Sequence, residues 1–158
     1  MGQEMSELKT EFLCDFDADI DWAGMVDVGD TPQGNRGIIY VTGGSFEGPK
    51  MKGVVLPGGG DWFIIRPDGT TVLDVRAAGR TDDGHTIYTY YRGVNVMSPE
   101  VRGRWLSGEN VDPSEYYFRT TPVFETGSEK YGWLNRIVAV GVGRFAPTGV
   151  AYKVYTIL

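Results

Sequence analysis

The sequence repeatedly places arginine, tyrosine and acidic residues at alternate positions of short extended segments. Successive side chains of a strand point to opposite faces, so Tyr117 and Arg119 share one face, opposite Phe118. By the same rule Asp74 and Arg76 share one face of their own segment. A carboxylate can exchange a proton, a phenol can deliver one to oxygen, and a guanidinium can stabilise developing negative charge. These faces therefore predict acid–base chemistry.

Three residues are predicted to be catalytic. Asp74 is the predicted general acid or base, with its pKa set by burial and by Arg76. Tyr117 is predicted to exchange a proton at a substrate oxygen, and Arg119 to stabilise an enolate or phenolate. This chemistry needs no cofactor, because positioning alone can lower a barrier by several kcal/mol.

Further aromatic and polar residues on the same faces are predicted to bind the substrate. They are Asp61, Trp62, Arg76, Tyr88, Tyr90, Arg92, Glu125, Trp133 and Asn135. The rings would stack on the ligand, and Arg92 and Asn135 would orient it. Asp61 and Glu125 are alternative carboxylates for the acid–base role.

Two orientations of these faces compete. In the first, the strands close into a barrel whose lumen holds the polar faces, as a barrel of about eight strands can enclose one small ligand. In the second, the polar faces point to solvent, and Leu73, Val75 and Leu134 form the core. We favour the first, because these faces are poor in the Lys, Ser and Glu that solvent faces use freely.

Sequence motifs for calcium, dinucleotide and zinc binding each lack residues or a following element that they require. The acidic run from Asp15 to Asp21 lacks the Gly and Glu that a calcium loop needs at its sixth and twelfth positions, where Ile20 and Val26 stand. The dinucleotide-like segment 141–146 is followed by proline rather than a helix. One histidine and one cysteine cannot build the usual zinc site, so we expect no metal and no cofactor.

Aromatic and β-branched segments broken by Gly and Pro predict a mainly β fold. The segments expected to form strands are 12–20, 37–48, 51–59, 61–77, 73–93, 115–136, 133–145 and 149–157. Asp68-Gly69 and Asp83-Gly84 predict hairpin turns, and Ser98 predicts the N-cap of one short helix. We therefore expect one antiparallel β-barrel of about eight or nine strands.

The composition limits the class of protein and its partners. The 158 residues fit one domain, and we expect residues 1–8 to be a flexible tail. A net charge of −6 without a basic stripe argues against nucleic acid, and no apolar run is long enough to cross a membrane as a helix. One cysteine and no recognisable secretion signal favour a cytoplasmic location. Abundant apolar strand faces suggest a homodimer.

Several motifs together resemble the domain of unknown function 3237 family of small β-barrel proteins. The most specific are "EYYFRTTPVFETG" with "YGWLN", and "LPGGGDW", and the likeness extends over residues 9–157. The resemblance implies an antiparallel barrel. Most members have no assigned activity, and some that are encoded beside natural-product pathways look like cofactor-free cyclases that close oxygen rings.

Three functions remain open. The first is a cofactor-independent enzyme of secondary metabolism that cyclises, isomerises or eliminates on a small aromatic or polyketide-like substrate. The second is a non-catalytic barrel that binds a small hydrophobic or aromatic molecule as a lipocalin does. The third is a structural or interaction subunit. A carboxylate with a raised pKa would favour the enzyme over the carrier.

Overall fold

The computed structural model describes residues 6–158, so residues 1–5 of the predicted tail lie outside the described part. The strands are β1 (Thr10–Ile20), β2 (Val26–Thr31), β3 (Gly34–Glu47), β4 (Lys52–Val55), β5 (Gly60–Asp61), β6 (Ile64–Ile65), β7 (Thr71–Thr81), β8 (Thr86–Val96), β9 (Tyr117–Glu125), β10 (Val138–Ala146) and β11 (Gly149–Ile157). The helices are α1 (Pro99–Leu106) and the two 3₁₀ turns η1 (Pro113–Glu115) and η2 (Gly132–Arg136).

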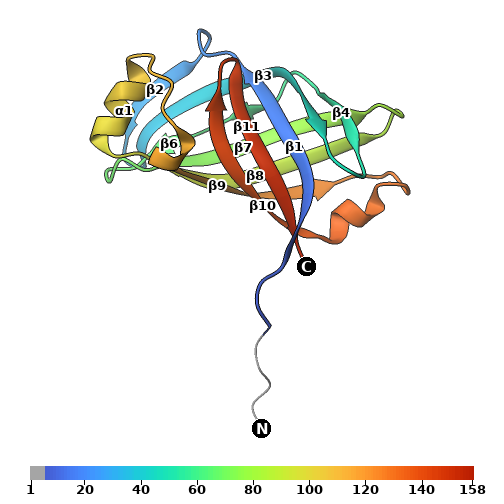
Figure 1. Cartoon of the computed structure of the whole chain (residues 1–158). Coiled ribbons are helices and arrows are strands. Elements are labelled where there is room, and N and C mark those ends of the chain that lie inside the picture. The colour runs from blue at the N-terminus through green and yellow to red at the C-terminus, as the bar shows by residue number, and fades with distance from the viewer. Residues whose placement is uncertain (1–5) are drawn as a thin grey trace.

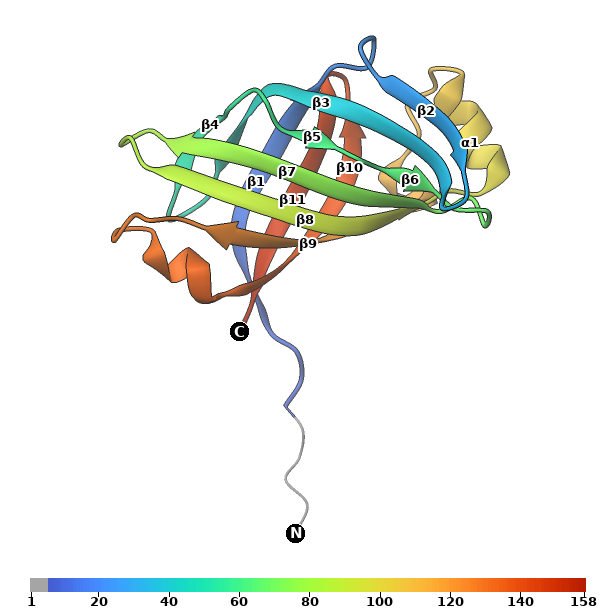
Figure 2. The ribbon, with the colours of Figure 1, turned by 180° about the vertical axis from the view of Figure 1, so that it is seen from behind.

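The strands form one closed antiparallel barrel with eight positions around its ring (Figure 1). The ring runs β1-β11-β10-β9-β8-β7, and β3 pairs back with β1 to close it. The remaining position, between β7 and β3, is shared by three short strands, and Figure 2 shows β4, β5 and β6 following one another along it. The predicted antiparallel barrel is therefore confirmed.

Local sequence signals account for the connections. Gly69 and Gly84 have φ angles of 83° and 89°, as the predicted hairpin turns before β7 and between β7 and β8 require. Ser98 caps α1 by accepting a hydrogen bond from the backbone N–H of Val101, with Pro99 in the first turn. The predicted helix is therefore confirmed. Strand β2, which we did not predict, runs through an acidic and exposed segment.

The barrel is not equally closed along its length. β1 pairs with the second half of β3 and ends at Ile20, while β2 pairs with the first half. β2 has no other partner strand within residues 6–158, so it does not continue the contact of β1 with β11. Figure 1 shows α1 at this end of the barrel, beside β2. Strand pairing around the ring is therefore interrupted at this end.

The opposite end is filled by a compact apolar plug. Leu134 in η2 is 1% exposed, and Tyr131 just before it is also buried. We expected residues 133–136 to extend as a strand with Trp133 and Asn135 on one face, and this is wrong because the segment turns as a 3₁₀ helix. Figure 1 shows this turn at the end of the barrel away from α1.

The alternation within strands is as expected, but its direction is the reverse of the one we favoured. In β7, Leu73 and Val75 are buried while Asp74 and Arg76 are exposed. In β9, Phe118 is among the most buried side chains of the barrel, at 1% exposed. Each Cβ of a closed barrel points either into the lumen or out to solvent, so the polar faces lie outside.

A register shift between Phe12 and Cys14 in β1 buries both Leu13 and Cys14, so the alternation of inner and outer side chains is interrupted there. None of the helices within residues 6–158 has the length and apolar character needed to cross a membrane. Apolar side chains such as Val138 and Val142 are exposed on the outer face, and the homodimer stays a prediction.

Truncating the plug should destabilise the barrel. We expect Leu134→Ala to lower the free energy of unfolding by about 2–5 kcal/mol, because it leaves a cavity in a fully packed site. Val138→Ala is the control, since Val138 is 66% exposed and its truncation should cost less than about 1 kcal/mol. Urea denaturation followed by circular dichroism measures both, and equal losses would contradict the assignment of Leu134 to the core.

Candidate ligand cavity in the barrel lumen

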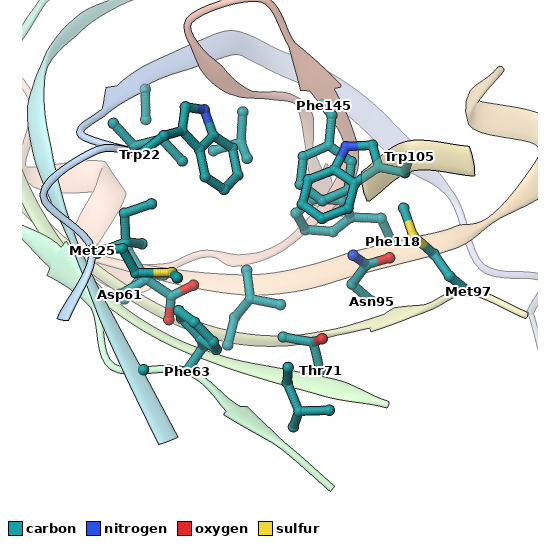
Figure 3. A pocket seen from close by; sticks show the side chains of 18 of the residues that line it. Trp22, Met25, Asp61, Phe63, Thr71, Asn95, Met97, Trp105, Phe118 and Phe145 are labelled. Atoms are coloured by element: carbon teal, nitrogen blue, oxygen red, sulfur yellow. The ribbon is translucent and has the colours of Figure 1, made fainter. Parts of the chain in front are cut away.

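A cavity of about 450 Å³ occupies the lumen toward the α1 end of the barrel (Figure 3). Its walls come from residues of every strand except β4, from α1 and from the β1–β2 turn. The lining is mainly apolar and aromatic, with a few polar groups. This size and this composition are typical of sites for small organic molecules.

Three aromatic rings form one side of the cavity where the β1–β2 turn, α1 and β10 meet. The ring centroids of Trp105 and Phe145 lie 4.6 Å apart, and those of Trp22 and Trp105 lie 5.8 Å apart. Trp22 is 42% exposed and Met25 is 45% exposed, although both also line the cavity. The cavity therefore meets solvent beside these two residues, through an apolar mouth (Figure 3).

A glycine run brings an acidic residue into the wall of the cavity. Gly58 has a φ of 107°, and a Cβ on Gly59 would collide with the carbonyl oxygen of Arg76 on β7. The run therefore lets the chain cross from β4 to β5 in close contact with β7. β5 then presents Asp61 beside Val75, on the inner face.

Asp61 is a carboxylate held in largely apolar surroundings. One of its oxygens accepts a hydrogen bond of 2.9 Å from the backbone N–H of Asp74. Burial raises the pKa of Asp61 to about 7, and the negative charge of Asp74 adds to this, while the hydrogen bond and Arg36 act in the opposite direction. Asp61 can therefore both accept and donate a proton near neutral pH.

Two tyrosines lie deep in the same cavity. Tyr91 and Tyr152 are 4% exposed, and their rings are 5.2 Å apart at an angle of 74°. Burial raises the pKa of both phenols, and the negative charge of Asp61 raises each further. Both therefore stay protonated at neutral pH and can donate a hydrogen bond to a ligand oxygen.

Of the predicted site residues, only Asp61 lines this cavity. The others that we predicted to face the lumen are exposed on the outer surface of β7, β8 and β9: Asp74, Arg76, Tyr90, Arg92, Tyr117, Arg119 and Glu125. Their inward orientation is wrong, since the inner positions of these strands hold residues such as Leu73 and Phe118. The catalytic roles predicted for Asp74, Tyr117 and Arg119 lose the enclosed site on which they depended.

The remaining predicted binding residues also lie outside the cavity. Trp62 shares a shallow depression of the outer surface with Arg36, Asp74 and Arg76. Tyr88 is half-buried, with its ring centroid 6.2 Å from that of Tyr90 on the outer face of β8. Trp133 is half-buried in η2, beneath the Lys50 ammonium.

Asn135, the last of them, has a structural role. Its side-chain oxygen accepts a 2.8 Å hydrogen bond from the backbone N–H of Thr126, and its side-chain nitrogen donates a 2.9 Å bond to the Thr126 carbonyl. This pair ties the turn η2 to the end of β9.

The residues that do line the cavity were largely missed. Tyr91 lies on the opposite face of β8 from the predicted residues Tyr90 and Arg92. Tyr152 lies in β11, which carries none of the predicted site residues. Trp105 lies in α1, whose N-cap at Ser98 was predicted, but only the fold brings its ring against Trp22 and Phe145. The alternation of β8 contained the missing signal, because Tyr91 stands opposite in phase to Tyr90 and Arg92.

Fold and site together define a closed antiparallel barrel with a ligand-sized apolar cavity and a buried carboxylate. The chain belongs to the family described as protein of unknown function (DUF3237), whose model matches residues 8–157. A relative, a UPF0311 protein from Clostridium acetobutylicum, is 43% identical over 124 residues, which cover 78% of each chain.

Solved structures share the fold. A conserved protein of unknown function from Rhodopseudomonas palustris superposes with a TM-score of 0.91 at 34% identity, covering 98% of this chain and all of that one. A protein described as an enzyme from Penicillium herquei superposes with a TM-score of 0.75 over the whole of both chains, at 21% identity. The second likeness shows the common fold alone.

The buried carboxylate predicts a pH-dependent stability. The pKa of Asp61 is about 7 in the folded protein and about 4 when unfolded. The folded state therefore holds the proton more tightly, and stability falls as pH rises from about 4 through about 7. We expect Asp61→Asn to raise the free energy of unfolding at pH 8 by about 1–3 kcal/mol, since the neutral amide removes the buried charge.

Asp74→Asn is the matched control, because Asp74 neighbours Asp61 but is exposed. The gain from Asp61→Asn should disappear below pH about 4, where the carboxyl is protonated in both states. Urea denaturation between pH 4 and pH 8 measures the difference. A loss of stability at pH 8 would show that the surroundings stabilise the ionised carboxylate rather than destabilise it.

Proposed function

We propose that the protein is a cofactor-independent enzyme that moves a proton on a small, mostly apolar ring molecule held in the lumen. The observation that carries the proposal is Asp61, an acid with a pKa of about 7 inside an apolar cavity of ligand size. Acid–base catalysis is most effective when the pKa of the catalytic group lies near the working pH.

The proposed step begins with the ionised form of Asp61. Its carboxylate takes a proton from a carbon next to a carbonyl, or from a hydroxyl, and negative charge develops on substrate oxygen. A neutral phenol, Tyr91 or Tyr152, donates a hydrogen bond to that oxygen. The protonated Asp61 then returns the proton to another atom of the same molecule, so the net reaction is an isomerisation or a ring closure that needs no cofactor.

Two further features support this class of substrate. The cavity side formed by Trp22, Trp105 and Phe145 offers flat apolar surfaces to an aromatic or polyketide-like ring system. The Penicillium protein that shares the fold is described as an enzyme, so this type of barrel is compatible with catalysis. The predicted small hydrophobic or aromatic partner is thus proposed to be the substrate.

A non-catalytic carrier is the second candidate, and the apolar lining of the cavity favours it equally. The two candidates differ in what Asp61 does. A carrier gains nothing from an acid whose buried charge destabilises the fold, whereas an enzyme uses that acid in every turnover.

The test uses a set of hydroxynaphthalene, naphthyl ketone and hydroxyanthrone compounds, with turnover followed by mass spectrometry and by deuterium uptake from D₂O. We expect Asp61→Asn to lower kcat by about 10²–10⁴-fold while changing the dissociation constant little. Asp74→Asn is the control and should retain turnover, because its side chain lies outside the cavity. It should move only the midpoint of the pH profile downward, since the charge of Asp74 helps to raise the pKa of Asp61.

With Asp61 as the base of the slow step, the wild-type rate should rise with pH through a midpoint near 7. Binding without proton exchange anywhere in the set supports the carrier. Full turnover by Asp61→Asn removes Asp61 from the mechanism and with it the proposed function.

A further inference from the structure

The cavity contains a second buried polar side chain, Asn95, on β8. Asn95 is 7% exposed and belongs to the cavity wall, and its Oδ1 atom has no hydrogen-bond partner within residues 6–158. Figure 3 shows its amide directed toward the space between Phe118, Trp105 and Thr71. Buried amides are nearly always hydrogen-bonded, so an unpartnered one in a ligand-sized cavity requires an explanation.

The neighbouring buried polar residue of the same strand behaves differently. Thr89 is 5% exposed, and its hydroxyl donates a 2.9 Å hydrogen bond to the carbonyl of Val123. Thr89 lies outside the cavity wall, whereas Asn95 is part of it. The structure therefore satisfies a buried polar group where the lumen is packed and leaves one unsatisfied where the lumen is hollow.

A cationic side chain lies at the same corner of the cavity. Arg102 of α1 also lines it and donates a 2.5 Å hydrogen bond to the carbonyl of Gly69. Gly69 comes just before Thr71, which stands opposite Asn95 in the β7–β8 register. The unpartnered Oδ1 of Asn95 accepts hydrogen bonds, so this corner is complementary to a hydroxyl group, whose own oxygen can in turn accept from the Arg102 guanidinium.

The strand register gives the separation of this corner from the acid. Asp61 stands opposite Val75 on β7, and Asn95 stands opposite Thr71 on the same strand. Four residues along a strand extend about 13 Å, and both side chains line the same cavity. A molecule that touches both must be elongated, with about the length of two or three fused rings.

We propose that Asn95 determines substrate specificity by accepting, at its Oδ1, a hydrogen bond from a hydroxyl group at one end of an elongated aromatic molecule. The other end of the molecule then lies against Asp61. That second statement depends on the proposed function, whereas the recognition of the hydroxyl by Asn95 does not. The unpartnered amide is kept for a ligand that completes its hydrogen bonds.

The test compares three probes of nearly equal size, namely 1-(2-naphthyl)ethanol, 2-acetylnaphthalene and 2-ethylnaphthalene, by isothermal titration calorimetry. The wild-type protein should bind the alcohol, which can donate a hydrogen bond to Oδ1, about tenfold more tightly than the ketone and the hydrocarbon, which cannot. Asn95→Leu should bind all three within about threefold of one another, because it keeps the size of the side chain and removes the amide. Thr89→Val should keep the wild-type preference.

The melting temperature gives a second, independent measurement on the same variants. Asn95→Leu should leave the melting temperature of the free protein unchanged or higher, since no hydrogen bond is lost. Thr89→Val should lower it, because the Val123 carbonyl loses its partner. A lower melting temperature for Asn95→Leu equal to that of Thr89→Val would show that the amide is structural, and would overturn the proposal.

The binding outcomes decide the rest. A preference for the alcohol that survives in Asn95→Leu overturns the proposal, and so does a wild-type protein that shows no preference for the alcohol or binds none of the probes. A failure of the proposed function appears elsewhere, as full turnover by Asp61→Asn. The two failures are distinguishable, since binding of the probes requires no proton transfer.

Discussion

The pairing of β1 with β3 is the constraint on which the rest of the structure depends, because it converts a twisted sheet into a tube with an inside. The two strands cross closely. A Cβ on Gly44 would collide with the carbonyl of Asp17, and one on Gly48 with that of Leu13. Glycines at these positions allow the ring to close. Once the ring is closed, every second side chain along each strand points into the lumen.

The lumen is filled at one end and hollow at the other, and this asymmetry separates stability from function. Around Leu134 the end of the barrel is filled by buried apolar side chains, which contribute to its hydrophobic stabilisation. Toward α1 the wall is instead interrupted, because β2 leaves the ring. Polar side chains, among them those of Asp61, Asn95, Tyr91 and Tyr152, face the space that results. An acid with a raised pKa and an unpartnered amide both oppose folding, as is common for residues kept for function.

The alternating charged and aromatic residues have a structural explanation on the outer surface. Asp74 stands opposite Arg92 in the β7–β8 register, and the Arg119 guanidinium lies 4.6 Å from the ring centroid of Tyr117. Such cross-strand and cation–π pairs stabilise an exposed sheet face by a few tenths of a kcal/mol to about 1 kcal/mol each. Tyrosine and arginine are therefore found there for pairing between strands, which also explains why lysine is scarce on this face.

Much of the architecture was accessible from the sequence. Hairpin turns at Gly69 and Gly84, the cap at Ser98 and the period of two along β7 are local properties of the chain, and local backbone chemistry determines them. The same alternation showed which residues share a face. Asp61 was among the candidate residues because it follows a glycine run and precedes Trp62, both visible in the sequence.

Only the tertiary structure decided which face of each strand lies inside. A period of two is symmetrical, and both faces of these strands carry aromatic rings, so Tyr90 and Tyr91 are equivalent until the ring closes. The cavity itself depends on contacts between distant segments, as where Trp22, Trp105 and Phe145 meet. The raised pKa of Asp61 likewise comes from burial by residues of several strands. Sequence alone thus determined a barrel and its turns, whereas the interior and its chemistry arise from closure.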